Sequence, residues 1–261
     1  MRRADAVRHR LRWRGAVVPA VILAAVELAA AVMDIEGGGL ASPSRIARAA
    51  FEALLDGSLL AATGQTLFSA VSGVLLGSAI GLLLGVALGL SRTLYWIFEV
   101  TLECIRPIPS VALIPVVLLI FGLGYWMEIS LVAKSALWPV FFFSVAAVRG
   151  IRVRLLEVSR LLEMNPLERM WKIVIPAALP GIFVGFRLSL GIALIVAVTV
   201  EVAANPLGLG NAMMRAQETV QPELMLAYLI WIRLIGWGFN SGIIWIQDRL
   251  FGRGARLPAQ P

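Results

Sequence analysis

The chain has 261 residues, of which 59% are hydrophobic, and its formal net charge is +7. This apolar share exceeds that of ordinary soluble domains, so the composition predicts a polytopic membrane protein. With Cys104 and His9 as the sole cysteine and histidine, an intrachain disulfide is excluded and thiolate clusters, histidine-rich metal sites and Ser-His hydrolysis are disfavoured. The aspartates all lie outside the apolar runs. An enzyme is therefore not expected, and neither are catalytic, cofactor-binding or metal-binding residues.

The N-terminal portion begins with an arginine-rich tail at residues 1–14, followed by an apolar run from Gly15 to Met33. A run of about 19 residues suits a membrane helix better than a signal-peptide core. Because Ala29-Ala30-Ala31 resembles a cleavage site, a signal peptide is the alternative to a retained helix. Residues 34–65 carry mixed charges and predict an external loop with a short surface helix. Tail, first helix and loop together form an N-terminal region, residues 1–57.

Two further spans come next, at residues 66–90 and about 94–122. Small residues recur at every fourth position of the second span: Gly73, Gly77, Gly81, Gly85 and Gly89. That spacing predicts a smooth helix face for close packing in lipid. The third span contains Pro107, Pro109 and Pro115, which predict a bent or unwound helix.

The remaining spans are expected at about residues 127–148, 182–203 and 226–246, so the fold class is an all-α membrane bundle of about six helices. Most of the 23 Lys and Arg residues then lie on one side, and the exceptions in external segments are Arg45, Arg48 and Arg215. The positive-inside rule therefore places both chain ends in the cytoplasm. It also explains the +7 charge better than nucleic-acid binding does.

A polar stretch from Arg149 to Gly181 interrupts these spans. Its apolar residues recur at helical spacing, which predicts a stripe that needs a partner: Ile151, Leu155, Val158 and Leu162. Asn165 is a predicted N-cap, with Pro166 at the first helical position and Glu168 placed for a capping box. Pro176 and Pro180 are expected to stop or kink the helix at that point. The pattern predicts a helix, a tight turn, a second helix and a proline break.

This stretch resembles the cytoplasmic loop of binding-protein-dependent ABC importer permeases, whose pattern is Glu-Ala-Ala, three residues, Gly, nine residues, Ile, one residue and Leu-Pro. Glu157, Ile173 and Pro176 match the pattern, with Ile175 in place of Leu and Val158-Ser159 in place of the alanines. Glu163 takes the Gly position. A left-handed turn at a glutamate would cost about 1–2 kcal/mol. Either the turn differs here or the coupling to the partner is altered.

The resemblance implies an importer-permease (MetI-like) fold whose loop, residues 149–180, docks on a cytoplasmic ATPase. The residues expected to make this coupling contact are Glu157, Ser159, Leu161, Leu162, Glu163, Asn165, Pro166, Ile173 and Pro176. No GxxxxGK[ST] motif occurs, so this chain is expected to bind no cofactor and the partner ATPase to use the ATP. The other implied partners are membrane lipid, a periplasmic or lipid-anchored substrate-binding protein and a second permease chain, identical or related, in the bacterial inner membrane.

The solute is expected to be small and anionic, because RPIPSVALIPVVLLIFGLG in the third span resembles the sulfonate, nitrate and taurine branch of the family. Charged residues at membrane depth are candidates for the translocation path because their burial is costly. The expected path residues are Arg106, Pro107, Pro109, Lys134 and Glu201. Other roles stay open: Lys134 and Arg233 could extend to the interface, Arg106 could pair with Glu103, and Glu201 could pair structurally or form an external gate.

The permease core is assigned to residues 58–250 and a cytoplasmic C-terminal tail to residues 251–261. Leu207-Gly208-Leu209-Gly210 and the following MMRAQETVQPEL resemble the external loop on which the binding protein docks, although an ordinary interfacial loop is equally compatible. An ATP-independent channel or secondary transporter is the alternative function, but it leaves the long polar stretch unexplained. A degenerate permease also stays open, because Glu163 replaces the glycine.

Overall fold

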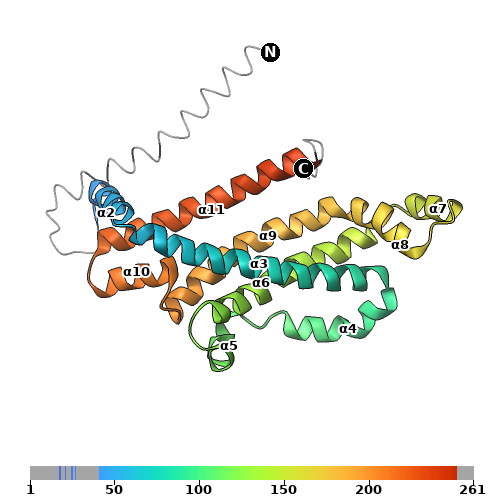
Figure 1. The fold of residues 1–261 in the computed structure, drawn as a ribbon, viewed down its shortest axis with the longest axis horizontal. Helices are drawn as coiled ribbons and strands as arrows, with labels where there is room; N and C mark the ends of the chain where they lie inside the picture. The colour runs from blue at the N-terminus through green and yellow to red at the C-terminus, as the bar shows by residue number, and fades with distance from the viewer. Residues whose placement is uncertain (1–17, 19–20, 22–24, 26, 28–40, 252–261) are drawn as a thin grey trace, which may run out of the picture. The chain divides into compact units, whose positions relative to one another are not determined.

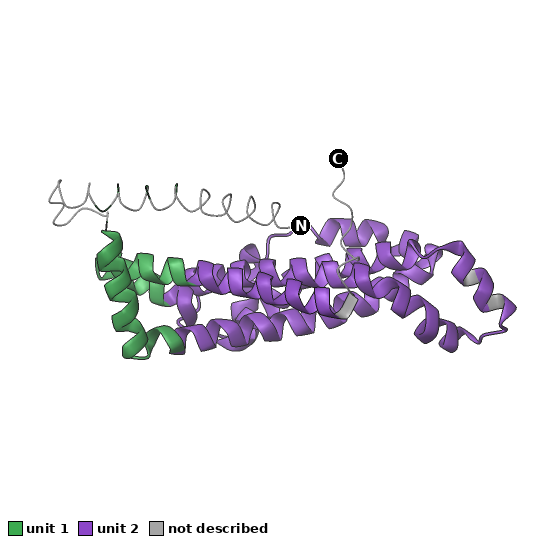
Figure 2. Cartoon of the chain, turned by 90° about the horizontal axis from the view of Figure 1, so that it is seen from above, with its two compact units in different colours: residues 1–60, 212–231 green, residues 61–211, 232–261 purple. Residues whose placement is uncertain are grey.

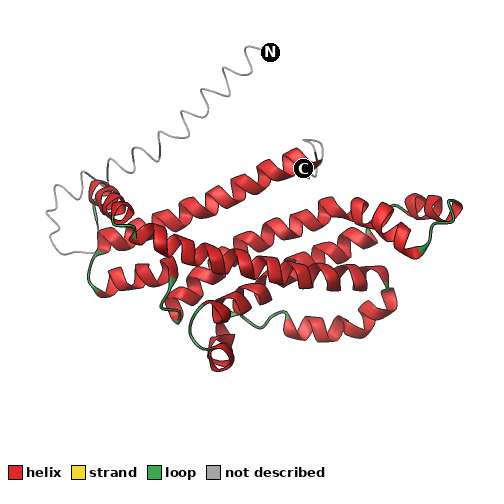
Figure 3. Ribbon diagram, viewed as in Figure 1, coloured by secondary structure: helices red, strands yellow, loops and turns green. Residues whose placement is uncertain are grey.

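The computed structural model describes residues 41–251 together with Val18, Val21, Ala25 and Glu27. Figure 3 shows that the secondary structure of this described part is helical, without strands. In chain order the elements are α2 (Pro43–Leu55), α3 (Ser58–Leu90), α4 (Arg92–Ile105), η1 (Val111–Leu113), α5 (Ile114–Phe121), α6 (Tyr125–Arg149), α7 (Val153–Leu161), α8 (Pro166–Arg169), η2 (Met170–Val174), α9 (Ile175–Ala203), α10 (Gly208–Glu218) and α11 (Pro222–Phe251) (Figure 1). The all-α membrane bundle expected from the sequence is thus confirmed.

Four helical segments are long and apolar enough to cross a membrane: Ser58–Leu90, Tyr125–Arg149, Pro166–Ala203 and Pro222–Arg249. They coincide with four of the six expected spans. The first expected span, residues 15–33, lies outside the described residues apart from four positions. In the third, α4 ends at Ile105, residues 106–110 leave the helix, and a 3-10 turn leads into α5. The prolines at 107 and 109 unwind this span, since neither can donate a helical hydrogen bond.

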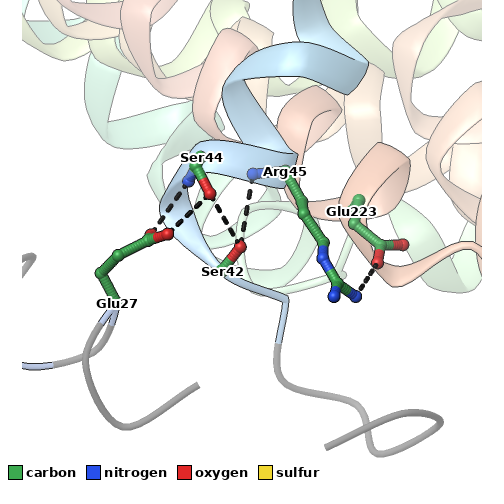
Figure 4. Close-up of polar contacts among 5 residues, drawn as sticks. All are labelled: Glu27, Ser42, Ser44, Arg45 and Glu223. Carbon is green, nitrogen blue, oxygen red and sulfur yellow. Dashed lines mark hydrogen bonds and ion pairs between the residues drawn. The ribbon is translucent and has the colours of Figure 1, made fainter. Parts of the chain in front are cut away.

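The chain divides into two compact units (Figure 2). Unit 1 comprises residues 1–60 and 212–231, and unit 2 comprises residues 61–211 and 232–261. Among the described parts of unit 1, the N-terminus of α2 is capped by Ser42, whose hydroxyl accepts a hydrogen bond from the N–H of Arg45 (Figure 4). Arg45 also forms an ion pair of 3.9 Å with Glu223. The surface helix expected between residues 34 and 65 is therefore α2.

The glycines of α3 make a close helix contact within unit 2. A Cβ built on Gly81 would lie 2.5 Å from the carbonyl oxygen of Leu137, and one on Gly85 would lie 2.6 Å from the Ser144 Cβ. A Cβ on Gly77 would overlap the backbone of Ala133. The predicted packing face of α3 is therefore confirmed, and it packs directly on α6.

The core of unit 2 joins three of the long helices. Its central cluster takes two small or branched residues from each of α3, α6 and α9: Ala70, Val74, Val132, Ala136, Ala193 and Ala197. The hydroxyl of Ser189 on α9 donates to the carbonyl oxygen of Ala136 on α6 at 2.6 Å. Small side chains at these positions allow the close helix approach that membrane bundles use.

Candidate functional site

The helix pair α7–α8 comes after α6 and exposes apolar side chains. Leu161 is 83% exposed and Leu162 is 63% exposed, and Leu155 and Val158 are exposed as well. Ile151 differs from them because it packs against the core cluster of Val148, Val174, Ala178 and Ile182. The predicted stripe therefore splits, since α7 begins only at Val153 and Ile151 belongs to the turn before it.

The turn between α7 and α8 is left-handed at Glu163, whose φ is 49°. The N–H of Met164 donates to the carbonyl oxygen of Ser159 at 3.1 Å, and this bond is one of the two that mark a Schellman C-cap. Glycine is the residue that this conformation favours, because a Cβ costs about 1–2 kcal/mol there. The backbone thus takes the shape that the family glycine suggests, with a glutamate in the strained position.

The start of α8 agrees with its predicted cap. The side chain of Asn165 accepts from the N–H of Glu168 at 2.8 Å, the Glu168 carboxylate accepts from the N–H of Asn165 at 3.3 Å, and Pro166 occupies the first turn. The expected proline break after α8 is wrong. Pro176 lies in the first turn of α9 and Pro180 lies within α9. A π-helical turn, η2, runs directly into α9, so the missing N–H of Pro176 lies at the junction where the hydrogen-bonding pattern changes and the helix continues.

The residues expected to couple to an ATPase form one contiguous segment, but not one uniform surface. Most are exposed: Glu157, Leu161, Leu162, Glu163, Asn165, Pro166 and Pro176. Ser159 is buried and Ile173 is half-buried. Exposed leucines and glutamates on a short helix pair can form a docking surface for another protein.

The unwound segment between α4 and η1 brings together four of the expected path residues. Pro107 and Pro109 lie in it and are exposed. The guanidinium of Arg106 lies 4.6 Å from the ring centroid of Phe142, and the Lys134 ammonium donates to the carbonyl oxygen of Ile108. Within the described residues Arg106 therefore contacts an aromatic ring and not Glu103. Lys134 on α6 holds the unwound segment in place by one of its freed carbonyl groups.

Glu201, the fifth expected path residue, lies in the protein interior, where it is 1% exposed. Its carboxylate accepts from the N–H of Gly210 at 2.8 Å. The same turn is held by α3, since Thr66 Oγ1 accepts from the N–H of Leu209 at 2.9 Å and Gln65 Oε1 from that of Gly208 at 2.8 Å. Gly208 has a φ of 87°, and a Cβ on it would overlap the Glu201 carboxylate.

Sequence reasoning missed three members of this buried group, Thr66, Glu128 and Asn205. Glu128 is 0% exposed, and its Oε2 accepts from the side-chain amide of Asn205 at 2.6 Å. One signal was available, because Glu128 stands near the start of an apolar run and such acids rarely occur there without a role. Its pairing with Asn205 depends on the tertiary fold. Together, Thr66, Glu128, Glu201 and Asn205 form a buried polar cluster, which is the name used for them below.

A cavity of about 500 Å³ lies between α9 and the unit 2 part of α11. Arg187 and Arg233 line it, and the Nε and Nη2 of Arg187 donate to the Asn240 Oδ1 at 3.2 and 3.1 Å. From the sequence alone, Arg233 is a side chain that could extend to the interface, and the two arginines are not placed together. Both stand in apolar runs, but their spacing along the chain gives no sign that they share a cavity.

Comparison with known proteins gives a consistent family. The model of the family "Binding-protein-dependent transport system inner membrane component" matches residues 73–253. SsuC of Bacillus subtilis (strain 168), described as an aliphatic sulfonates transport permease protein, is 32% identical over 244 residues, which cover 93% of this chain and 88% of SsuC. The taurine transport system permease protein TauC of Escherichia coli (strain K12) is 29% identical over 161 residues, 62% of this chain and 58% of TauC.

A solved structure of the MetNI methionine ABC transporter in inward-facing conformations shares the fold. The TM-score is 0.58 at 22% identity, and the match covers 72% of this chain and 95% of the other. The chain therefore belongs to the family of inner membrane components of binding-protein-dependent transport systems, as a permease subunit of an ABC importer.

Proposed function

We propose that this permease imports a small organic anion of the sulfonate class and couples to its ATPase through residues 151–176. The observation that carries the coupling proposal is the exposed helix pair α7–α8, with Leu161 and Leu162 largely in solvent beside a left-handed turn. Such apolar exposure on a charged segment is costly unless a partner covers it. ATP is bound and hydrolysed by that partner, and this chain contributes the path.

The arrangement in the membrane is based on the charge asymmetry. Six spans place both chain ends and the pair α7–α8 in the cytoplasm, and residues 207–224 on the outer side, where a periplasmic or lipid-anchored binding protein delivers the solute. Two copies of this chain, each with one ATPase, enclose the path. Arg106, Pro107 and Pro109 belong to the unwound segment that lines it, and Lys134 of α6 holds this segment in place. Irregular backbone at membrane depth belongs next to a path or inside protein.

The solute class is supported by relatives and by charge. SsuC and TauC are named for aliphatic sulfonates and taurine, which are both sulfonates. The membrane-depth cations Arg106, Lys134, Arg187 and Arg233 favour an anion in the protein. Nitrate and other small anions are the competing solutes.

Coupling can be tested by purifying the tagged chain from its native membranes in mild detergent and identifying the proteins that accompany it. We expect an ATPase with the wild type and its loss with Glu157→Lys, which reverses a charge on α7. Glu218→Lys, an exposed glutamate on α10, is the matched control and should retain the ATPase. An ATPase that stays bound to both variants would refute this docking surface.

Transport is tested with the purified complex in proteoliposomes, with the binding protein added outside. We expect ATP-dependent uptake of labelled taurine or butanesulfonate and no uptake when ATP is replaced by a non-hydrolysable analogue. Uptake that continues without the ATPase would instead favour a channel or secondary transporter. Uptake of nitrate but of neither sulfonate would overturn the solute class and leave the importer assignment intact.

A further inference from the structure

The cavity between α9 and α11 combines apolar walls with cationic groups. Its polar lining comes from Arg187, Arg233, Asn240 and Thr199, while the walls are aliphatic and aromatic residues such as Leu194 and Phe239. A volume of about 500 Å³ lies within the range of small-molecule sites. Both helices are long and apolar enough to cross a membrane. The cavity therefore places two guanidinium groups in a mostly apolar environment.

The positive charge of the cavity has no counter-charge among the residues that line it, which include no aspartate or glutamate. Arg187 is held by the neutral amide oxygen of Asn240. Ion pairs across the described ranges involve other residues: Arg45–Glu223, Arg48–Glu52 and Lys172–Glu168. Arg187 is half-buried and Arg233 and Asn240 are exposed, so both guanidinium groups are accessible, and an anion near them offsets the repulsion between their like charges.

The spacing of the polar groups defines the shape of the ligand. Asn240, which holds Arg187, lies seven residues after Arg233 on α11, a separation of about 10 Å along the helix axis. Arg187 is already oriented by two hydrogen bonds, so its guanidinium loses little freedom when it binds an oxyanion. The Arg233 side chain is long enough to extend along much of this separation, so both guanidinium groups can approach one oxyanion while the apolar wall contacts its aliphatic chain. A bare inorganic ion would leave most of this wall unfilled.

We propose that this cavity binds an oxyanion carried on a short aliphatic chain through the guanidinium groups of Arg187 and Arg233. In transport this ligand is the imported sulfonate, so the inference rests on the proposed function and places the solute inside the permease. An anionic lipid has the same chemistry in its phosphate and acyl chain. The two sources are separated by the composition of the surrounding bilayer.

The test uses the purified permease–ATPase complex in nanodiscs of phosphatidylcholine, with labelled butanesulfonate as the probe and butanesulfonamide as the neutral comparison. We expect saturable binding of butanesulfonate and none of butanesulfonamide. Arg233→Gln and Arg187→Gln should each weaken binding at least about tenfold, because each removes a charge-assisted hydrogen bond. Arg92→Gln, at an exposed arginine on α4, is the control and should bind as the wild type does.

A second variant separates charge from fold. Asn240→Asp keeps the acceptor for Arg187 and almost the same shape, but it places a carboxylate in the cavity. We expect it to lower butanesulfonate affinity by at least about tenfold while the melting temperature stays within a few degrees of that of the wild type. Binding that is unchanged in Asn240→Asp and in both Gln variants, with ATP-driven uptake intact, would overturn the cavity proposal and leave the importer assignment standing.

To test for a lipid ligand, the butanesulfonate binding measurement is repeated in nanodiscs that contain phosphatidylglycerol. If this lipid abolishes butanesulfonate binding to the wild type and co-purifies with it but not with Arg233→Gln, the site holds a lipid headgroup and the solute assignment is overturned. If butanesulfonate binds equally in both bilayers, the solute assignment is supported. Absence of both binding and ATP-driven uptake in every preparation would instead refute the proposed function itself.

Discussion

Two regions of unit 2 differ in the kind of side chain that they bury and the kind that they expose. The buried polar cluster encloses acids and amides, and its members donate to and accept from one another or the backbone of the adjacent turn. The helix pair α7–α8 exposes leucines, and α8 is only four residues long. Both acids of the cluster accept a hydrogen bond within the chain, but one buried oxygen each of Glu128, Glu201 and Asn205 has no hydrogen-bond partner among the described residues. Exposed apolar groups on such short helices, in contrast, call for another chain. The first region is enclosed within the subunit, and the second is accessible to a partner.

The largest loss of stability is expected in the buried polar cluster. Glu201→Ala leaves the N–H of Gly210 without its acceptor and opens a cavity, which should lower the free energy of unfolding by about 3 kcal/mol. The melting temperature of the purified protein in detergent measures the loss. Glu218→Ala, at an exposed position on α10, should change it by less than about 0.5 kcal/mol. Equal effects of the two changes would show that the cluster contributes no more than the surface does.

A smaller loss is expected at the unwound segment. Lys134→Met removes the ammonium that donates to the carbonyl oxygen of Ile108 and keeps a side chain of similar length. Loss of one charge-assisted hydrogen bond should cost about 1.5–3 kcal/mol, toward the lower end because Ile108 is exposed and water can replace the donor. Faster amide hydrogen exchange at residues 106–113 would report the loosened segment. Unchanged exchange there would contradict the assigned role of Lys134.

In the helix pair, one substitution should raise stability. Glu163→Gly removes the Cβ from a residue with a φ of 49°. Relief of about 1–2 kcal/mol of strain, partly offset by the greater freedom of glycine in the unfolded chain, predicts a gain of up to about 1 kcal/mol. We expect coupling to be kept or improved, as judged by ATP-dependent uptake. A large loss of uptake would show that the glutamate side chain itself takes part in coupling.

The smallest effect on stability is expected from Leu161→Asp. This side chain is 83% exposed, so its replacement should change the free energy of unfolding by less than about 0.5 kcal/mol. Recovery of the ATPase in the pull-down should nevertheless fall at least tenfold, if about 1.5 kcal/mol of interface energy is lost. A Leu161→Asp variant with a clearly lower melting temperature would show that this side chain stabilises the subunit. A variant that keeps its ATPase would show that the side chain is not part of the docking surface.

Local features of the sequence predicted local features of the structure. Asn165, Pro166 and Glu168 specify a helix start within four residues, and the capping box is present as expected. The glycines of α3 recur at every fourth residue, so the sequence of this one helix is enough to predict its smooth face. Pro180 misled the prediction, because a proline inside a long apolar helix can be kept when neighbouring helices hold the backbone, and the sequence of one segment does not show its neighbours.

Features that join distant segments could not be predicted in this way. Glu128 and Asn205 are 77 residues apart, and Arg187 and Asn240 are 53 apart, so only the packing of α6, α9 and α11 brings each pair together. Glu201 is expected on the path because an isolated acid in an apolar run suggests function, and that role stays a prediction. Its hydrogen bond to Gly210 and its burial depend on the turn after α9, and the sequence does not show how that turn folds back.

The glycines that join α3 to α6 have a consequence for how this gene can vary. Glycine is the smallest residue, so every missense change at positions 73, 77, 81, 85 and 89 adds a Cβ. That Cβ would lie 3.0 Å or less from an atom of α6. The opposite face of α3 carries exposed residues such as Leu83, which can change in either direction. Random mutagenesis should therefore recover many replacements on the exposed face of this helix and few on the glycine face. The intolerant positions should recur at every fourth codon.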